Sequence, residues 1–138
     1  MNAKLRRAVR ERAGGRCEYC RLPEGATAEP FSTDHIIAEQ HLGPTSLENL
    51  AYACAHCNRH KGPNIAGIDP RTGILVQLFS PQASGWSLHF AWSGTMVEGL
   101  TPIGRATVLV LNMNHPERVL MRELLIQLGE FPSAGSGS

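Results

Sequence analysis

The chain has 138 residues, of which 42% are hydrophobic and 18% charged, and its formal net charge is only +1. These values are those of an ordinary globular protein, and they exclude a disordered, low-complexity or strongly basic chain. No apolar run approaches the roughly 20 residues that a membrane-spanning helix needs, so we expect no membrane partner.

The first expected element is a helix over residues 3–13 (AKLRRAVRERA), whose residues have good helix propensity. Apolar residues recur every four positions from Leu5 to Ala13 and form a narrow stripe, and two glycines directly after it end the helix. The remaining face carries Arg6, Arg7 and Arg10. This basic face is either solvated or in contact with phosphate groups, and both interpretations stay open.

All four cysteines fall in two Cys-x-x-Cys pairs, which are Cys17, Cys20, Cys54 and Cys57. Each such pair folds into a tight knuckle that directs two sulfurs at one point, and two pairs complete the tetrahedral ligand set of zinc. Because four thiolates leave no open coordination position, we predict a structural Zn²⁺ ion. Metal thiolates in a chain without an apolar leader favour a reducing compartment, so we expect a cytoplasmic protein.

Between the two knuckles, the pattern predicts a strand, a loop and a second strand. A loop over residues 21–28 leads to a strand over 29–37, a polar loop over 38–47 follows, and residues 49–54 form the second strand. From Cys57 the second knuckle continues into a helix, which Gly62-Pro63 ends. The loop between the strands is long for a hairpin, and long loops often carry function.

Three polar residues of this unit are candidates for chemistry. Asp34 and Asn58 supply hard oxygen ligands suited to Mg²⁺ or Mn²⁺. Histidine side chains ordinarily change protonation near neutral pH, so His35 is a candidate general base. Neighbouring residues of a strand point to opposite faces, so Asp34 and His35 share a face only if the strand bends or bulges there.

The other basic residues of the region receive weaker assignments. Nine of the 13 Lys and Arg residues precede Gly62, in the same half of the chain as the candidate site. Arg59 and Lys61 are candidates for phosphate contact, with a solvated helix face as the alternative. On a helix, His60 is turned about 200° from Asn58 and does not readily share its metal. We interpret His41, His56 and His60 as exposed to solvent or adjacent to phosphate.

The second half of the chain has a different pattern of predicted strands and helices. Strands are expected over residues 74–79, 86–92 and 96–100, as a small antiparallel meander. The four apolar residues Trp86, Leu88, Phe90 and Trp92 then share one face at a period of two. Thr101-Pro102 matches a helix N-cap followed by proline, and a break at residues 114–116 separates two C-terminal helices.

We expect these helices to cover the meander and to form with it a core that is independent of the zinc site. The residues expected in this core are Trp86, Phe90, Trp92, Leu109, Leu120 and Leu124. The domain organisation that follows is a lobe over residues 1–67, a meander with helices over 68–131, and a disordered tail over 132–138.

Residues 17–62, with the motifs C-x2-C, DHI, Asn49-Leu50 and C-x2-C-N-x2-K-G, resemble the HNH endonuclease family. The resemblance covers about a third of the chain. The stretch from DPRTG to Arg122 also resembles the tail of small bacterial HNH proteins, most of them known as predicted nucleases. The implied fold is α+β: a ββα-metal motif with a structural four-cysteine zinc site, then a small antiparallel β-meander and C-terminal helices.

The resemblance implies a metal-dependent endonuclease that hydrolyses phosphodiester bonds of nucleic acid, with DNA as the expected substrate for nicking or cutting. His35 is then the general base, and Asp34 and Asn58 hold one Mg²⁺ or Mn²⁺ ion. Asn49 corresponds to the family residue that braces the loop and orients the histidine. In the family the Asp-His pair sits where the strand gives way to the loop, so the alternation of the strand does not have to hold.

One alternative comes from a different functional class. A non-catalytic, zinc-stapled module that binds nucleic acid or a partner protein would keep the same scaffold. The combination of Asp34, His35 and Asn58 favours the nuclease, because a binding module has no use for two metal ligands and a base.

Overall fold

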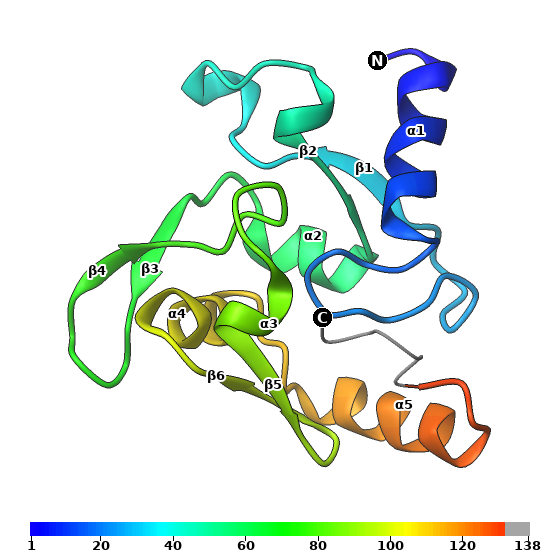
Figure 1. The fold of residues 1–138 in the computed structure, drawn as a ribbon, viewed down its shortest axis with the longest axis vertical. Coiled ribbons are helices and arrows are strands. Elements are labelled where there is room, and N and C mark those ends of the chain that lie inside the picture. The colour runs from blue at the N-terminus through cyan, green and yellow to red at the C-terminus, as the bar shows by residue number, and fades with distance from the viewer. Residues whose placement is uncertain (132–138) are drawn as a thin grey trace.

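The structure is a computed structural model that describes residues 1–131 (Figure 1). Its helices are α1 (Ala3–Ala13), α2 (Ala55–Lys61), α3 (Trp86–His89), α4 (Pro102–Val110) and α5 (Pro116–Gln127), with 3-10 turns η1 (Glu39–His41) and η2 (Leu47–Asn49). Its strands are β1 (Ser32–His35), β2 (Leu50–Ala53), β3 (Ala66–Ile68), β4 (Leu75–Gln77), β5 (Phe90–Ser93) and β6 (Met96–Gly99). The expected tail, residues 132–138, lies outside the described residues.

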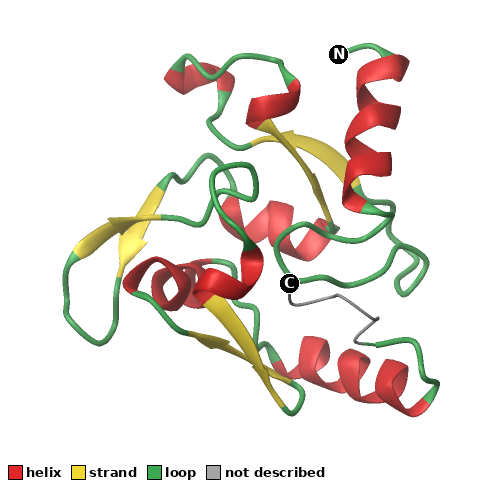
Figure 2. Ribbon diagram, in the orientation of Figure 1, coloured by secondary structure: helices red, strands yellow, loops and turns green. Residues whose placement is uncertain are grey.

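The strands form small two-stranded antiparallel sheets, β1 with β2, β3 with β4 and β5 with β6 (Figure 2). This mixture of helices and small antiparallel sheets confirms the α+β class. Within residues 1–131, no helix is both long and apolar enough to cross a membrane.

Helix α1 has the bounds that the sequence predicts. The side chain of Asn2 caps its first turn by accepting a hydrogen bond of 2.8 Å from the Leu5 amide. Gly14 closes it with φ of 65°, a left-handed conformation that glycine adopts without strain. Val9 and Ala13 are buried, and the apolar stripe packs on Leu50 and Tyr52 of β2.

Strands β1 and β2 are shorter than expected and pair with Ser32 opposite Ala53 and His35 opposite Leu50. At the end of β2, Cys54 leaves the ladder to become the N-cap of α2, and its sulfur accepts a hydrogen bond from the Cys57 amide. This cap explains why α2 begins at Ala55 rather than at Cys57.

The expected three-stranded meander is wrong in its connections. β4 pairs with β3, an upstream strand that is not predicted from the sequence, and within residues 1–131 β5 pairs only with β6. At Gly67 in β3, a Cβ atom would lie 2.7 Å from a methyl carbon of Val110 on α4. The absence of a side chain at this position therefore lets α4 pack directly on β3.

The expected strand over residues 86–92 begins as the helical turn α3. Trp86 and Phe90 are both buried, but Leu88 is 61% exposed, so the three residues do not share a face. A spacing of four fits either a strand or a helix, and only the intervening residue distinguishes them. The turn brings the Trp86 indole Nε1 within 2.8 Å of the Tyr19 carbonyl, to which it donates.

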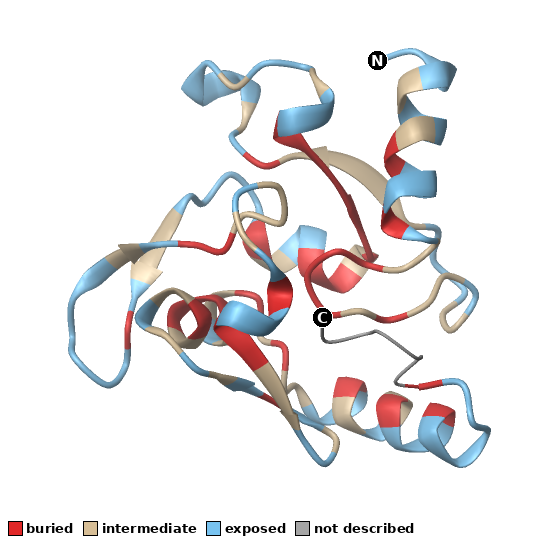
Figure 3. Cartoon of the chain, viewed as in Figure 1, coloured by how far each residue is buried: buried red, intermediate tan, exposed pale blue. Residues whose placement is uncertain are grey.

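One hydrophobic core contains all four cysteines together with Phe79, Trp86 and Phe90. The prediction of a core independent of the zinc site is therefore wrong. Buried residues occur along β2 and in parts of α2, α4 and α5 (Figure 3). The buried residues of the helices also differ from those expected, since Leu109, Leu120 and Leu124 are 58%, 56% and 53% exposed. The helices bury instead a different set, Ala106, Thr107, Leu125 and the guanidinium-bearing Arg118 and Arg122.

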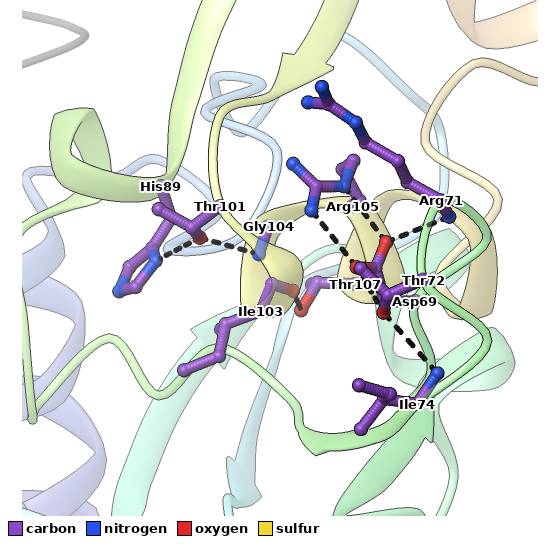
Figure 4. Close-up of polar contacts among 10 residues, drawn as sticks. All are labelled: Asp69, Arg71, Thr72, Ile74, His89, Thr101, Ile103, Gly104, Arg105 and Thr107. Atoms are coloured by element: carbon purple, nitrogen blue, oxygen red, sulfur yellow. Dashed lines mark hydrogen bonds and ion pairs between the residues drawn. The ribbon is translucent and has the colours of Figure 1, made fainter.

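The turn between β3 and β4 is fixed to α4 by one buried carboxylate (Figure 4). Nε and Nη2 of Arg105 donate to the two carboxylate oxygens of Asp69 at 2.8 and 2.9 Å. The hydroxyl of Thr72 and the amide of Arg71 donate to the same group. The Arg105 guanidinium and these hydrogen bonds hold the pKa of Asp69 well below its usual range.

Candidate active site and metal centre

The four cysteines converge as the spacing predicts. All four side chains are buried, and their sulfurs lie within 4.8 Å of one another. The sulfurs of Cys20 and Cys54 are 3.7 Å apart, close to the roughly 3.8 Å between sulfurs of a tetrahedral zinc site with bonds of about 2.3 Å. Backbone amides of Cys20 and Cys57 donate to the sulfurs of Cys17 and Cys54, each at 3.4 Å. The residues fit a structural zinc ion.

The protonation of this cluster also favours a bound cation. Burial raises the pKa of the Cys17 thiol, whereas hydrogen bonds from the other cysteines lower the pKa of Cys54. Without a metal, a buried group of this kind keeps few of its thiols deprotonated, because the negative charges repel one another. A dication removes this repulsion.

A buried arginine lies beside the cysteine cluster. Arg122 is 2% exposed, donates to the carbonyls of Thr95 and Met113, and forms no ion pair with a carboxylate within residues 1–131. Burial lowers its pKa, and the nearby Cys20 and Cys57 raise it. A zinc ion held by four thiolates would have a net charge of about −2, which this cation would partly compensate.

Asp34 lies on the face of β1 that is turned toward the core and α2. Its neighbour across the sheet is Ala51, which belongs to the main core. Burial raises the pKa of Asp34, and a hydrogen bond of 2.7 Å from the Ser32 hydroxyl opposes this, with smaller effects of Lys61 and His35. A half-buried carboxylate with no ion pair among the described residues fits a position that receives a cation.

His35 is the last residue of β1, where the strand gives way to the loop. Its ring nitrogen Nε2 lies 2.8 Å from the Thr45 hydroxyl and 3.3 Å from a carboxylate oxygen of Glu39. Both partners come from the loop over residues 36–49, and neither is predicted from the sequence. Ser32 would have been recognisable, because a residue two positions before Asp34 in a strand lies on the same face.

Asn49 is buried at the base of the same loop. Its Oδ1 accepts a hydrogen bond from the Ile37 amide at 3.0 Å, and its Nδ2 donates to the carbonyls of Ile37 and Pro44 at 2.9 and 2.8 Å. One side chain therefore satisfies three backbone groups of the loop and closes it against the start of β2.

Helix α2 lies against β1 and presents Asn58 and Lys61 one turn apart. Asn58 is exposed, and its side chain makes no hydrogen bond to the part of the chain that the structure describes. Lys61 differs from the expected surface position, since it is 5% exposed and its Nζ donates to the Ile36 carbonyl at 2.8 Å. Burial lowers the pKa of Lys61, and Asp34 partly offsets this.

The expected exposure of the other histidines is only partly correct. His41 is exposed, but His56 is buried, and its Nε2 lies 2.9 Å from the Asn112 carbonyl. His60 is half-buried, and its ring packs on that of His56 with centroids 4.1 Å apart. Exposed Arg59 lies 3.5 Å from Glu29 in an ion pair at the surface.

The model of the HNH endonuclease family matches residues 17–64 of this chain. Comparisons with curated proteins and with solved structures find no match. The matched segment begins at Cys17, the first cysteine of the cluster, and ends just after α2, and it includes the loop that Asn49 closes.

Proposed function

Residues 17–64 form an HNH endonuclease domain, and on this premise we propose that the protein is a metal-dependent endonuclease. Its proposed reaction is hydrolysis of phosphodiester bonds in nucleic acid, with DNA as the substrate to test first. The observation that carries the proposal is the end of β1, where Asp34 lies on the face turned toward α2, the helix that bears Asn58, and His35 follows it at the start of the loop.

His35 is the proposed general base. Its Nε2 has a hydroxyl partner, Thr45, at 2.8 Å. A water molecule at that distance would be within the reach of about 2.6–3.2 Å that proton abstraction requires. Thr45 and Glu39 restrict the ring, and Asn49 fixes the loop that carries both, so the imidazole is positioned before substrate binds.

Asp34 and Asn58 are the proposed ligands of the catalytic cation, because a carboxylate and an amide oxygen are hard donors suited to Mg²⁺ or Mn²⁺. When bound, such an ion neutralises charge on the scissile phosphate and on the departing oxygen. Ser32 orients the Asp34 carboxylate through its hydrogen bond. The ammonium of buried Lys61 supports the same corner by holding α2 to the Ile36 carbonyl.

The four cysteines have a different role in this proposal. Zinc held by four thiolates has no position for water or substrate, so it does not take part in the reaction. It ties the base of α2 to the first knuckle and so fixes the helix that presents Asn58.

The test is cleavage of supercoiled plasmid DNA by purified protein with Mg²⁺, Mn²⁺ or EDTA, next to His35→Ala. We expect metal-dependent conversion to nicked or linear DNA, and a loss of about 100-fold or more in His35→Ala, because a positioned base contributes on the order of 10²-fold or more. Retained DNA binding by the variant, measured by gel shift, would show that the loss is catalytic.

The same experiment separates the alternative of a non-catalytic binding module. That module would bind nucleic acid or a protein equally well with and without His35 and would release no cleaved product from any DNA or RNA. Wild-type protein that is folded, contains zinc and cleaves no DNA or RNA would therefore replace the nuclease proposal with the module.

A further inference from the structure

A basic groove lies beside the candidate active site, between α1 and β1. It has a volume of about 520 Å³, and its walls include Arg6 and Arg7 of α1, Phe31, and Ser32 and Thr33 of β1. Figure 1 shows α1 running alongside the two-stranded sheet that carries Asp34 and His35. None of the motifs in the family match includes α1, which precedes residue 17.

The protein neutralises only part of the charge of this groove, which Arg10 also lines. Arg10, one helical turn after Arg6, forms an ion pair with Glu24, which also accepts a hydrogen bond from the Tyr52 hydroxyl. Arg6 and Arg7 form no ion pair within residues 1–131. Two exposed guanidinium groups therefore remain available to an anionic ligand.

The placement of these charges also opposes the stability of the helix. α1 has no acidic residue in its first turn, and Lys4, Arg6 and Arg7 all lie within its first two turns. Positive charges near the N-terminal end of a helix interact unfavourably with its dipole. Residues that destabilise their own helix are often retained because they serve a function. A bound anion at the N-terminal end of α1 would offset the repulsion between these basic side chains and the helix dipole.

The groove and the proposed base lie on the same face of the sheet. The register places Thr33 opposite Tyr52 and His35 opposite Leu50, and both partners pack toward α1. Two residues along a strand span about 6.6 Å, which is roughly the rise of two nucleotides in one nucleic acid strand. A strand held by Arg6 and Arg7 would therefore continue toward His35 within a few nucleotides.

We propose that Arg6 and Arg7 bind the phosphodiester backbone of the substrate on one side of the scissile bond. This inference rests on the proposed function and names the surface that holds the nucleic acid. The contacts are to phosphate rather than to bases, because the exposed guanidinium groups of Arg6 and Arg7 supply positive charge that no carboxylate within residues 1–131 pairs, and phosphate is the charged part of the ligand. Recognition here is therefore independent of sequence.

The experiment measures binding without cleavage, by fluorescence anisotropy in the His35→Ala background without added divalent cation. The probes are a labelled duplex of about 20 base pairs and the corresponding single strand, titrated at salt concentrations from about 0.05 to 0.3 M. The variants are Arg6→Ala, Arg7→Ala and the double variant, since alanine preserves helix propensity. Arg71→Ala, an exposed arginine in the β3–β4 turn, is the matched control (Figure 4).

Each lost phosphate contact should lower the slope of log K against log salt by about 0.9 for duplex and about 0.7 for single strand. The double variant should then bind duplex about 60-fold more weakly at about 0.1 M salt and almost as well as the parent at about 1 M. The two probes identify which form of nucleic acid the groove holds. Arg6→Lys should restore most of the slope, because the contact is electrostatic, and Arg71→Ala should leave it unchanged.

Unchanged affinity and salt dependence in the double variant would refute the proposed phosphate binding by Arg6 and Arg7 while leaving the nuclease proposal intact. A wild-type protein that binds neither probe would also overturn the groove. Salt-dependent binding that requires Arg6 and Arg7, in a protein that cleaves nothing, would support the groove and refute the nuclease. The two proposals therefore fail in different experiments.

Discussion

Asn49 and Ile37 exchange two hydrogen bonds, of 3.0 and 2.9 Å, that close the loop after His35 against the beginning of β2. A third bond from the same amide reaches the Pro44 carbonyl, next to Thr45. Thr45, which contacts the His35 ring, therefore follows directly after Pro44, whose carbonyl Asn49 binds. We propose that Asn49 acts on the reaction through this loop, as a positioning residue.

Replacement of Asn49 by alanine should leave three backbone groups without their partner. We expect a loss of about 1–3 kcal/mol in the free energy of unfolding, measured by urea denaturation, since the site is buried. The catalytic rate at saturating substrate should fall by about 100-fold, because a displacement of about 1 Å at a base has effects of this size.

Exposed Asn64, which makes no side-chain hydrogen bond within residues 1–131, offers the matched control Asn64→Ala. That variant should keep wild-type stability and rate. If Asn49→Ala weakens DNA binding but leaves the catalytic rate unchanged, its role is not to position His35.

Removal of zinc should disrupt the whole molecule and not one lobe. Purified protein should contain about one zinc ion per chain, and Cys17→Ser or Cys54→Ser should unfold it, because zinc binding supplies folding energy. The shared core extends this effect to Trp86, whose indole donates to the Tyr19 carbonyl between two zinc ligands. A chelator should therefore change Trp86 fluorescence together with the far-UV circular dichroism.

The single-tryptophan background for this measurement is Trp92→Phe. The indole Nε1 of Trp92 is buried without a hydrogen-bond partner in the described part of the chain, so phenylalanine should be tolerated or slightly stabilising. Readdition of zinc should restore the signal. Folded protein that contains no zinc, or Trp86 fluorescence that does not change when the chelator is added, would contradict the prediction.

Variants of the two proposed ligands of the catalytic cation should lose cleavage for a different reason than variants of the proposed base, His35. Asp34→Asn and Asn58→Ala should lower cleavage by weakening the affinity for Mg²⁺, so that excess metal partly restores Asn58→Ala, whose amide is a neutral ligand. A metal titration of the initial cleavage rate measures this. Asp34→Asn should recover less, because it removes the only charge of the pair.

His60→Ala is the control on the same helix. The His60 ring packs on His56, and its Nδ1 lies 2.8 Å from the His56 carbonyl, so it belongs to the side of α2 that faces Asn112. Its replacement should leave cleavage nearly unchanged. Loss of cleavage in His60→Ala with normal cleavage in Asn58→Ala would show that the metal ligand of α2 is assigned wrongly.

The Asp69–Arg105 pair should make stability sensitive to acid. The pKa of Asp69 is lower in the folded protein than in the unfolded chain, so its contribution is fully present above about pH 5. This contribution should fall as the pH drops through about 3.9, the ordinary aspartate value, and continue to fall toward the folded pKa.

Asp69→Asn should be less stable than the wild type at pH 7, and the difference should shrink between pH 5 and pH 3 in urea denaturation. Glu117→Gln, at an exposed position in the first turn of α5, is the control for a surface carboxylate. An equal acid dependence in wild type and Asp69→Asn would show that another group dominates.

Several features of the protein follow from its sequence alone because they depend on local rules. The spacing of the cysteines determined the two knuckles, since two intervening residues leave few directions for the sulfurs of each pair, and two such pairs complete the ligand set of one zinc ion. Thr101-Pro102 and the glycines after Ala13 set helix boundaries through caps that need only neighbouring residues. The two strands and helix of the family match have the predicted order for the same reason.

Other features were decided only by contacts between distant segments. Apolar residues four positions apart, such as Trp86 and Phe90, fit both a strand and a helical turn. In the helical turn, the Trp86 indole donates a hydrogen bond to the distant Tyr19 carbonyl. β3 pairs with β4 and lies against α4 at Gly67, and no pattern near residue 67 predicts either contact. Lys61 is buried because its ammonium donates to the Ile36 carbonyl, and Arg122 is buried because its guanidinium donates to the Met113 carbonyl. Long charged side chains can be buried where backbone carbonyls accept their hydrogen bonds, and these carbonyls come from distant parts of the chain.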